Sequence, residues 1–219
     1  MKIIRLDSKE YTPSKIICVG KNFPDHVKEM GGSALPGEPV IFLKPNSAIA
    51  FNPREVAIPE SLGLLHHEVE LCILAGRGGR QLTPDEAGSI ACGYAVGIDF
   101  TLRERQAEAK KAQGPWALAK GFDLSAVFGE FASAGAVNDP LDLDISLSVD
   151  GALRQSGSTR DMIFSPGAII SFVSRFMTVE PGDIFMCGTP AGVGEVRDND
   201  EIEAGIDGLP RLHFRVVRK

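Results

Sequence analysis

Two glutamates lie two positions apart in the segment His-His-Glu-Val-Glu-Leu, at Glu68 and Glu70. In a β-strand, side chains two positions apart point to the same face, so the two carboxylates would project together. Their mutual repulsion requires a compensating charge, and ligands that are all oxygen favour Mg²⁺ or Mn²⁺ over Zn²⁺. The alternative is an exposed strand face on which both carboxylates are merely solvated.

A third carboxylate, Asp99, ends a short apolar run further along the chain. At the end of a buried strand it would complete an oxygen-ligand site with the two glutamates and leave positions open for water or substrate. Asp99 could instead cap the helix that follows. The adjacent His66 and His67 lack the His-Glu-x-x-His spacing, which excludes a zinc-protease helix, and we expect them to support the site or pack beside it rather than bind metal.

A short helix over residues 25–30 carries His26 and Glu29 three positions apart, and therefore on one face. Glu29 could accept a hydrogen bond from one ring nitrogen and orient the other, which is the arrangement of a general base and its partner. An ordinary surface pair is the alternative. Gly31 and Gly32 end the helix and offer a hinge, so we expect residues 22–32 to form a mobile lid.

Polar and cationic side chains follow these acidic residues. Arg103 and Gln106 share one face of a polar helix predicted over residues 103–113, although a solvated charged face would show the same pattern. Lys120 stands alone in an apolar stretch, where it either extends its ammonium to solvent or pairs with an anion. The glycine-rich run 187–194 lacks a dinucleotide fingerprint, but its backbone N–H groups, beginning at Gly188, and the Thr189 hydroxyl could bind a carboxylate.

Hydrophobic patterning and turn residues predict the elements that position these groups. We expect residues 46–62 to be a connecting loop, Asn22 to cap the first helix, and Asp150-Gly151 to form a hairpin turn. The result is one β-rich α+β domain over residues 1–219. The predicted strands cover residues 15–20, 40–44, 68–74, 94–98, 143–149, 184–187, 201–206 and 212–217, and the predicted helices cover 25–30, 83–91, 103–113 and 165–176.

Composition restricts the class of protein. The 219 residues are 43% hydrophobic and 24% charged, as in ordinary globular proteins. A net charge of −6 disfavours a nucleic-acid surface or a polybasic membrane anchor. Arg5 and Asp7 interrupt the first apolar residues, so we expect neither a secretory leader nor a membrane span, and the four dispersed cysteines suit a reducing, cytoplasmic setting.

Six motifs in order give the chain a specific resemblance to the fumarylacetoacetate hydrolase family. They include Gly-x-Asn-aromatic-x-x-His, Phe-Leu-Lys-Pro and His-His-Glu-x-Glu-Leu in the first third of the chain. Gly-Tyr with Asp-x-Thr-x-Arg, then Pro-Trp with Ala-Lys-x-Phe-Asp, and finally Gly-Thr-Pro-x-Gly-Val-Gly follow. Phe23 replaces the commoner Tyr of the first motif, and Gln106 follows Arg103-Glu-Arg rather than the usual Arg-Asp-x.

The resemblance implies a mixed β-roll that forms a homodimer and binds a small 2-oxo acid. It also implies Mg²⁺, with Mn²⁺ as the alternative ion, at the three carboxylates. It assigns the catalytic roles to His26, Glu29 and Lys120, and substrate contacts to Arg103, Gln106 and the Gly188-Thr189 loop. The implied activity is metal-dependent C–C hydrolysis of acylpyruvates to a carboxylate and pyruvate, together with oxaloacetate decarboxylation. Alternatives are an isomerase or hydratase of 2-hydroxymuconate-type acids, and a non-catalytic acid-binding protein.

Overall fold

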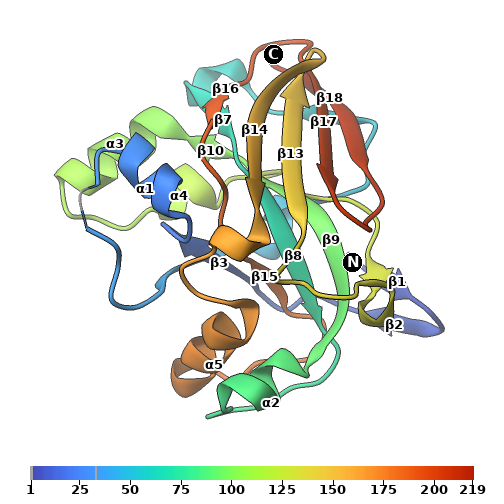
Figure 1. Ribbon diagram of the computed structural model, residues 1–219. Helices are drawn as coiled ribbons and strands as arrows, with labels where there is room; N and C mark the ends of the chain where they lie inside the picture. The colour runs from blue at the N-terminus through green and yellow to red at the C-terminus, as the bar shows by residue number, and fades with distance from the viewer. Residues whose placement is uncertain (1, 33) are drawn as a thin grey trace.

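A mixed eight-stranded sheet forms the centre of the computed structural model, which describes residues 2–32 and 34–219 (Figure 1). Met1, the first residue of the segment in which we expect no leader, lies outside the described residues. In spatial order the sheet contains β4 (Val40–Lys44), β3 (Ile16–Gly20), β15 (Ile184–Met186), β8 (Val69–Ala75), β9 (Ala91–Asp99), β11 (Ala126–Phe128) and β5 (Ile49–Phe51), and β12 (Ala132–Ser133) pairs with β9.

Both faces of this sheet are buried, because alternate residues of its strands belong to two different hydrophobic clusters. On β8, Leu71 and Ile73 pack into one cluster, whereas Cys72 and Leu74 pack into the other. This explains why the strand is apolar without alternation, apart from Glu70.

The first cluster lies between the central sheet and a five-stranded sheet, which includes the hairpin predicted at Asp150-Gly151. Both turn residues have positive φ, +50° and +75°, as the sequence predicts for such a turn. The five-stranded sheet runs β14 (Ala152–Ser158), β13 (Asp144–Val149), β17 (Glu201–Ile206), β18 (Leu212–Val217) and β6 (Glu55–Ala57).

Two small sheets and five α-helices complete the fold of the described residues. Figure 1 shows α1, α3 and α4 together on one side of the central sheet, and α2 with α5 near its end. The small sheets are β1 (Ile4–Leu6) with β2 (Lys9–Tyr11), and β10 (Thr101–Leu102) with β7 (Leu65–His67) and β16 (Gly194–Glu195). The helices are α1 (Pro24–Glu29), α2 (Pro84–Gly88), α3 (Arg103–Lys111), α4 (Ala117–Lys120) and α5 (Pro166–Phe176). Single 3₁₀ turns cover Asn46–Ala48, Glu60–Leu62, Ala134–Ala136 and Thr159–Asp161.

The prediction of a mixed α+β fold is confirmed, but two local predictions are wrong. Residues 46–62 are not simply a loop, because β5 and β6 lie within them and pair in parallel with the distant strands β11 and β18. Asn22 does not cap α1; its amide is buried and donates to the carbonyls of Phe164 and Cys187 at 3.0 and 2.7 Å. Thr83 and Ser165 do cap their helices as predicted.

None of the helices in the described part of the chain is both long and apolar enough to cross a membrane.

Candidate metal centre and active site

Strand register brings the three predicted carboxylates together. The Asp99 N–H donates to the Glu68 carbonyl at 2.8 Å, and Glu70 lies opposite Gly97 on the β8–β9 ladder. Side chains two positions apart share a face, so all three carboxylates project on the same side of the sheet. One oxygen from each lies within 4.8 Å of the others, and all three residues are buried. This excludes the alternative of a solvated strand face.

Lys120, at the end of α4, contacts two of the three predicted carboxylates. Its Nζ donates to Glu68 Oε2 at 2.7 Å, to Asp99 Oδ2 at 2.6 Å and to Thr101 Oγ1 at 2.6 Å. Burial alone would lower the pKa of Lys120, but the adjacent Asp99 and Glu68 charges outweigh it and raise that pKa. Lys120 is therefore a buried ammonium ion, and it does not extend to solvent.

Lys44 is a second buried ammonium group, to which the sequence interpretation gave no role. It lies on β4 with 1% of its surface exposed, and its Nζ is 2.7 Å from Asp99 Oδ1. It also donates to the carbonyl and hydroxyl of Ser125, both at 3.0 Å. The sequence feature that could have identified Lys44 is a single lysine at the end of an apolar strand, just before Pro45.

Arg103 and Gln106 face the site and not bulk solvent. The Arg103 guanidinium donates to Glu68 Oε1 and to Gln106 Oε1, both at 2.6 Å, and its Nε lies 3.3 Å from His66 Nδ1. Burial and the charge of Arg103 lower the pKa of His66 to about 4, so His66 is neutral at neutral pH. It supports the arginine, as we expected of a residue outside the ligand set.

The two glutamates have opposite electrostatic environments. Burial by itself would raise the pKa of Glu68, but Lys120 and Arg103 outweigh it and hold that pKa well below its usual value. Burial raises the pKa of Glu70 well above its usual value, and the charges of Asp99 and Glu68 raise it further. Glu70 accepts a hydrogen bond from the Gly188 N–H at 2.7 Å, so this amide already holds a carboxylate of the chain.

His26 and Glu29 form the predicted pair on α1. His26 Nδ1 lies 3.1 Å from Glu29 Oε2, and the other Glu29 oxygen accepts the Gly192 N–H at 2.9 Å. A proton on Nδ1 would be donated to Glu29 and would leave a lone pair on Nε2. His26 is 7% exposed and lines the same pocket as Glu68 and Glu70. Phe23, where the family resemblance leads us to expect Tyr, packs into the hydrophobic core.

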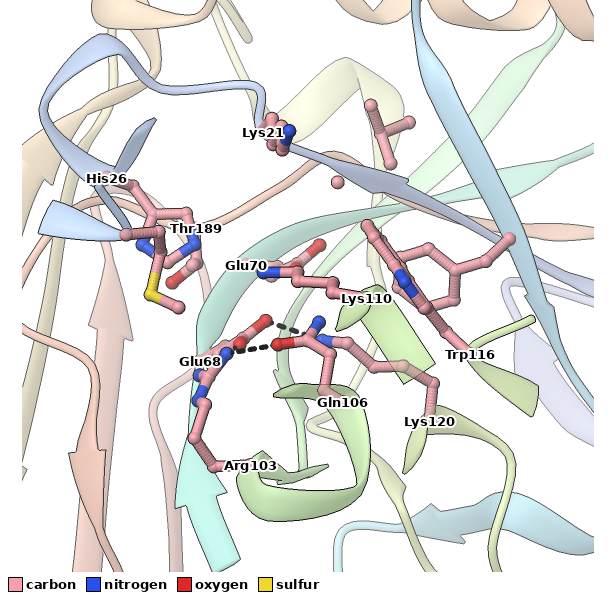
Figure 2. Close-up of a pocket in the computed structure, with 14 residues that line it drawn as sticks. Lys21, His26, Glu68, Glu70, Arg103, Gln106, Lys110, Trp116, Lys120 and Thr189 are labelled. Carbon is pink, nitrogen blue, oxygen red and sulfur yellow. Dashed lines mark hydrogen bonds and ion pairs between the residues drawn. The ribbon is translucent and has the colours of Figure 1, made fainter. Parts of the chain in front are cut away.

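Figure 2 shows how these groups surround one pocket. His26 and Thr189 lie on one side of Glu68 and Glu70, and Lys120 and Trp116 lie on the other. Lys110 also lines this pocket, and its Nζ stands 5.6 Å from the centre of the Trp116 ring, a distance typical of a cation–π contact. The pocket thus combines acid–base groups, carboxylates and cations that could attract an anionic ligand.

The residues present fit a divalent cation bound through oxygen. Three converging carboxylates are the ligands that Mg²⁺ and Mn²⁺ prefer. Asp99 Oδ1 is buried and accepts no hydrogen bond from the described residues, and its one close contact is the Lys44 ammonium at 2.7 Å. This oxygen therefore retains the capacity to bind an ion.

Residues 15–217 match the protein family described as "Fumarylacetoacetate (FAA) hydrolase C-terminal". The chain belongs to the fumarylacetoacetate hydrolase family. It is 48% identical over 203 residues to "Oxaloacetate tautomerase FAHD1, mitochondrial" of Rattus norvegicus, covering 93% of this chain and 91% of that protein.

Two solved structures of this family are similar over almost the whole chain. One is fumarylpyruvate hydrolase from Pseudomonas aeruginosa in complex with Mn²⁺ and pyruvate, which is 34% identical, has a TM-score of 0.94 and covers 100% of this chain and 96% of that one. The other is 5-carboxymethyl-2-hydroxymuconate delta-isomerase from Mycobacterium smegmatis, with 36% identity, a TM-score of 0.85 and coverage of 95% and 80%. Membership of this family of enzymes argues against a non-catalytic acid-binding protein.

Proposed function

We propose that this protein is a divalent-metal-dependent enzyme that converts a 2-oxo acid to and from its enol form, with oxaloacetate as the first candidate substrate. The observation that carries the proposal is the His26–Glu29 pair, whose histidine lines one pocket with Glu68 and Glu70, two of the three carboxylates able to bind a metal ion. The name of the rat relative, an oxaloacetate tautomerase, supports the choice of substrate.

Charge supports a dianionic substrate. Around the centre, the carboxylates of Glu68, Glu70 and Asp99 stand against the cations Lys120, Arg103 and Lys44. With all six groups ionised these charges cancel. A divalent cation would then leave an excess of two positive charges, which the two carboxylates of oxaloacetate would neutralise.

A bound Mg²⁺ or Mn²⁺ would act as a Lewis acid toward the carboxylate and keto oxygens of the 2-oxo acid. His26 Nε2 is the group that would take the proton from C3, while Glu29 orients the ring and balances its positive charge. His26 could then deliver that proton to the oxygen at C2, which completes the tautomerisation with no net gain or loss of atoms. Lys120 would help to stabilise the negative charge that develops on that oxygen.

A second candidate activity is hydrolysis of acylpyruvates, which the same His26–Glu29 pair favours because it could also activate water. The base would take a proton from water, the hydroxide would attack the distal carbonyl, and the C–C bond would break to give a carboxylic acid and the enolate of pyruvate. Oxaloacetate decarboxylation would release CO₂ and form the same enolate. The similarity to fumarylpyruvate hydrolase supports this candidate, and the similarity to the muconate isomerase supports a related isomerisation.

The direct test is to follow the conversion of enol-oxaloacetate to its keto form by ultraviolet absorbance, with Mg²⁺ or Mn²⁺ and again after EDTA. We expect the metal-loaded protein to accelerate the conversion and EDTA to abolish the acceleration. Parallel assays with acetylpyruvate and a 2-hydroxymuconate separate the candidate activities. Conversion of none of these acids would refute the proposal. We also propose that residues 1–219 form a single catalytic domain and that the protein is cytoplasmic.

A further inference from the structure

Gln155, on β14, is a buried amide in contact with the loop that ends the active site. It is 0% exposed, and its side chain bridges the start of β8 to residues 189–190. Gln155 Oε1 lies 3.1 Å from the Val69 N–H, and Gln155 Nε2 lies 2.9 Å from the Pro190 carbonyl. A backbone N–H can only donate and a carbonyl can only accept. These two contacts therefore identify the oxygen and the nitrogen of the Gln155 side-chain amide.

This assignment determines which atom donates in each of the remaining hydrogen bonds of Gln155. His67 Nδ1 lies 2.9 Å from Gln155 Oε1, and because that oxygen can only accept, the histidine nitrogen is the donor. At the other end, Gln155 Nε2 donates to Thr189 Oγ1 at 2.7 Å. Among the described residues this is the only hydrogen bond of the Thr189 hydroxyl.

A hydroxyl that accepts a hydrogen bond from an amide must direct its own hydrogen elsewhere. Thr189 lines the pocket that contains Glu68 and His26, and it is 2% exposed. We infer that Gln155 is a positioning residue, which keeps the Thr189 hydroxyl as a hydrogen-bond donor toward a carboxylate of the substrate. The inference rests on the proposed function, because it takes a 2-oxo acid as the ligand.

A Gln155→Glu substitution reverses the direction of the hydrogen bond between residue 155 and Thr189. A carboxylate still accepts from Val69 and His67, but it has no N–H for Thr189 or for the Pro190 carbonyl, so the threonine hydroxyl turns to donate to it. The hydroxyl then presents only lone pairs to an anionic ligand. Thr189→Val removes the hydroxyl at nearly constant shape, and Thr189→Ser retains it.

The experiment measures oxalate binding by calorimetry at saturating Mn²⁺, with oxalate as a mimic of the enolate. Because a hydrogen bond to a charged group is worth roughly 1.5–3 kcal/mol, we expect Thr189→Val and Gln155→Glu each to weaken binding about 10- to 100-fold. Thr189→Ser should stay close to the wild type. The double variant should bind no more weakly than Thr189→Val alone, because Gln155 acts through this hydroxyl.

Additive losses in the double variant, or wild-type affinity of Gln155→Glu, would overturn the inference while leaving the proposed function intact. A wild-type protein that binds no oxalate overturns both. If Gln155→Glu does not fold, a crystal structure of the wild type with Mn²⁺ and oxalate provides the test. Thr189 Oγ1 must then contact an oxalate oxygen while it keeps its bond from Gln155; a hydroxyl turned to a protein acceptor refutes the inference.

Discussion

At the scale of single residues, charge balance determines what each carboxylate can do. Glu68 is held as an anion by Lys120 and Arg103, and Asp99 contacts Lys120 and Lys44. Glu70 makes no such ion pair within the described residues and relies on the Gly188 N–H. A divalent cation would compensate Glu70, whose charge is otherwise disfavoured by burial. Glu70 is therefore the ligand on which metal binding should depend most.

Glu70→Gln should lower Mn²⁺ affinity at least tenfold, because an amide oxygen replaces a charged ligand. The fold should survive, since the amide oxygen can still accept the Gly188 N–H. Calorimetry with Mn²⁺ and a thermal denaturation curve measure the two effects, and the matched control is Glu203→Gln, at an exposed position of strand β17. Unchanged Mn²⁺ affinity in the Glu70 variant would place the metal elsewhere.

His26→Ala separates the candidate activities. Loss of a general base should reduce acylpyruvate hydrolysis and oxaloacetate tautomerisation by roughly 10²–10⁴-fold in kcat. Decarboxylation should fall less, because it needs mainly stabilisation of the enolate, to which Lys120 would contribute. Lys120→Ala should depress all three. Separate kcat and KM values for each substrate are the measurement, since a purely gating role of His26 would appear in KM. An unchanged kcat for every substrate would remove His26 from the mechanism.

At the scale of elements, helix α1 depends on its surroundings for stability. It has six residues, its N-cap Phe23 makes no side-chain cap, and isolated helices this short do not persist in water. Phe23 at its start packs into the hydrophobic core, Val27 is buried, and Glu29 accepts a hydrogen bond from the Gly192 N–H. The helix is thus attached to the molecule at a few points that ligand binding could reinforce.

The lid hypothesis predicts amide exchange that depends on ligand. With Mn²⁺ bound, residues 22–32 should exchange quickly without oxalate and several times more slowly with it, because oxalate in the pocket would contact His26, which the helix carries. Hydrogen exchange followed by mass spectrometry measures this. Helix α5, which is eleven residues long and capped by Ser165, is the internal control and should not change. Equal protection of α1 in both states would contradict a mobile lid.

The sequence predicts an element of this structure well when the residues that interact to form it lie close together along the chain. Capped helices, the hairpin at Asp150-Gly151 and the carboxylates of Glu68 and Glu70 follow from spacing within a few residues. The strands β5 and β6 could not be found this way, because their partners lie far along the chain. Lys44 and Gln155 were missed for the same reason, since their roles arise from contacts with distant segments.

At the scale of the whole molecule, we propose that two copies associate through the side formed by β4 and α4. Helix α4 lies beside the edge strand β4. Leu118 is 79% exposed on this helix and Leu43 is 45% exposed on this strand. Exposed leucines on and beside a strand edge that pairs with no other strand of the described residues suit burial against another subunit.

Light scattering should therefore give a mass twice the 23.4 kDa of one chain. Leu118→Lys should shift the protein toward the monomer at micromolar concentration, because a buried charge without a partner disfavours association. Leu153→Lys, at another highly exposed leucine on β14 with 63% exposure, is the matched control and should leave the mass unchanged. A wild-type mass of one chain would refute the dimer, and equal behaviour of the two variants would refute this interface.

Glu29 uses both of its carboxylate oxygens, one for His26 and one for the Gly192 N–H in the glycine-rich loop. The same loop carries Thr189, so the orientation of His26 and the position of the Thr189 hydroxyl both depend on the conformation of this loop. Gly192 has a φ of +98°, and a Cβ at this position would collide with the Arg154 carbonyl. The loop therefore requires glycine at this position. Because Glu29 joins this loop to His26, a displacement of the loop by a bound ligand would also change the orientation of the imidazole.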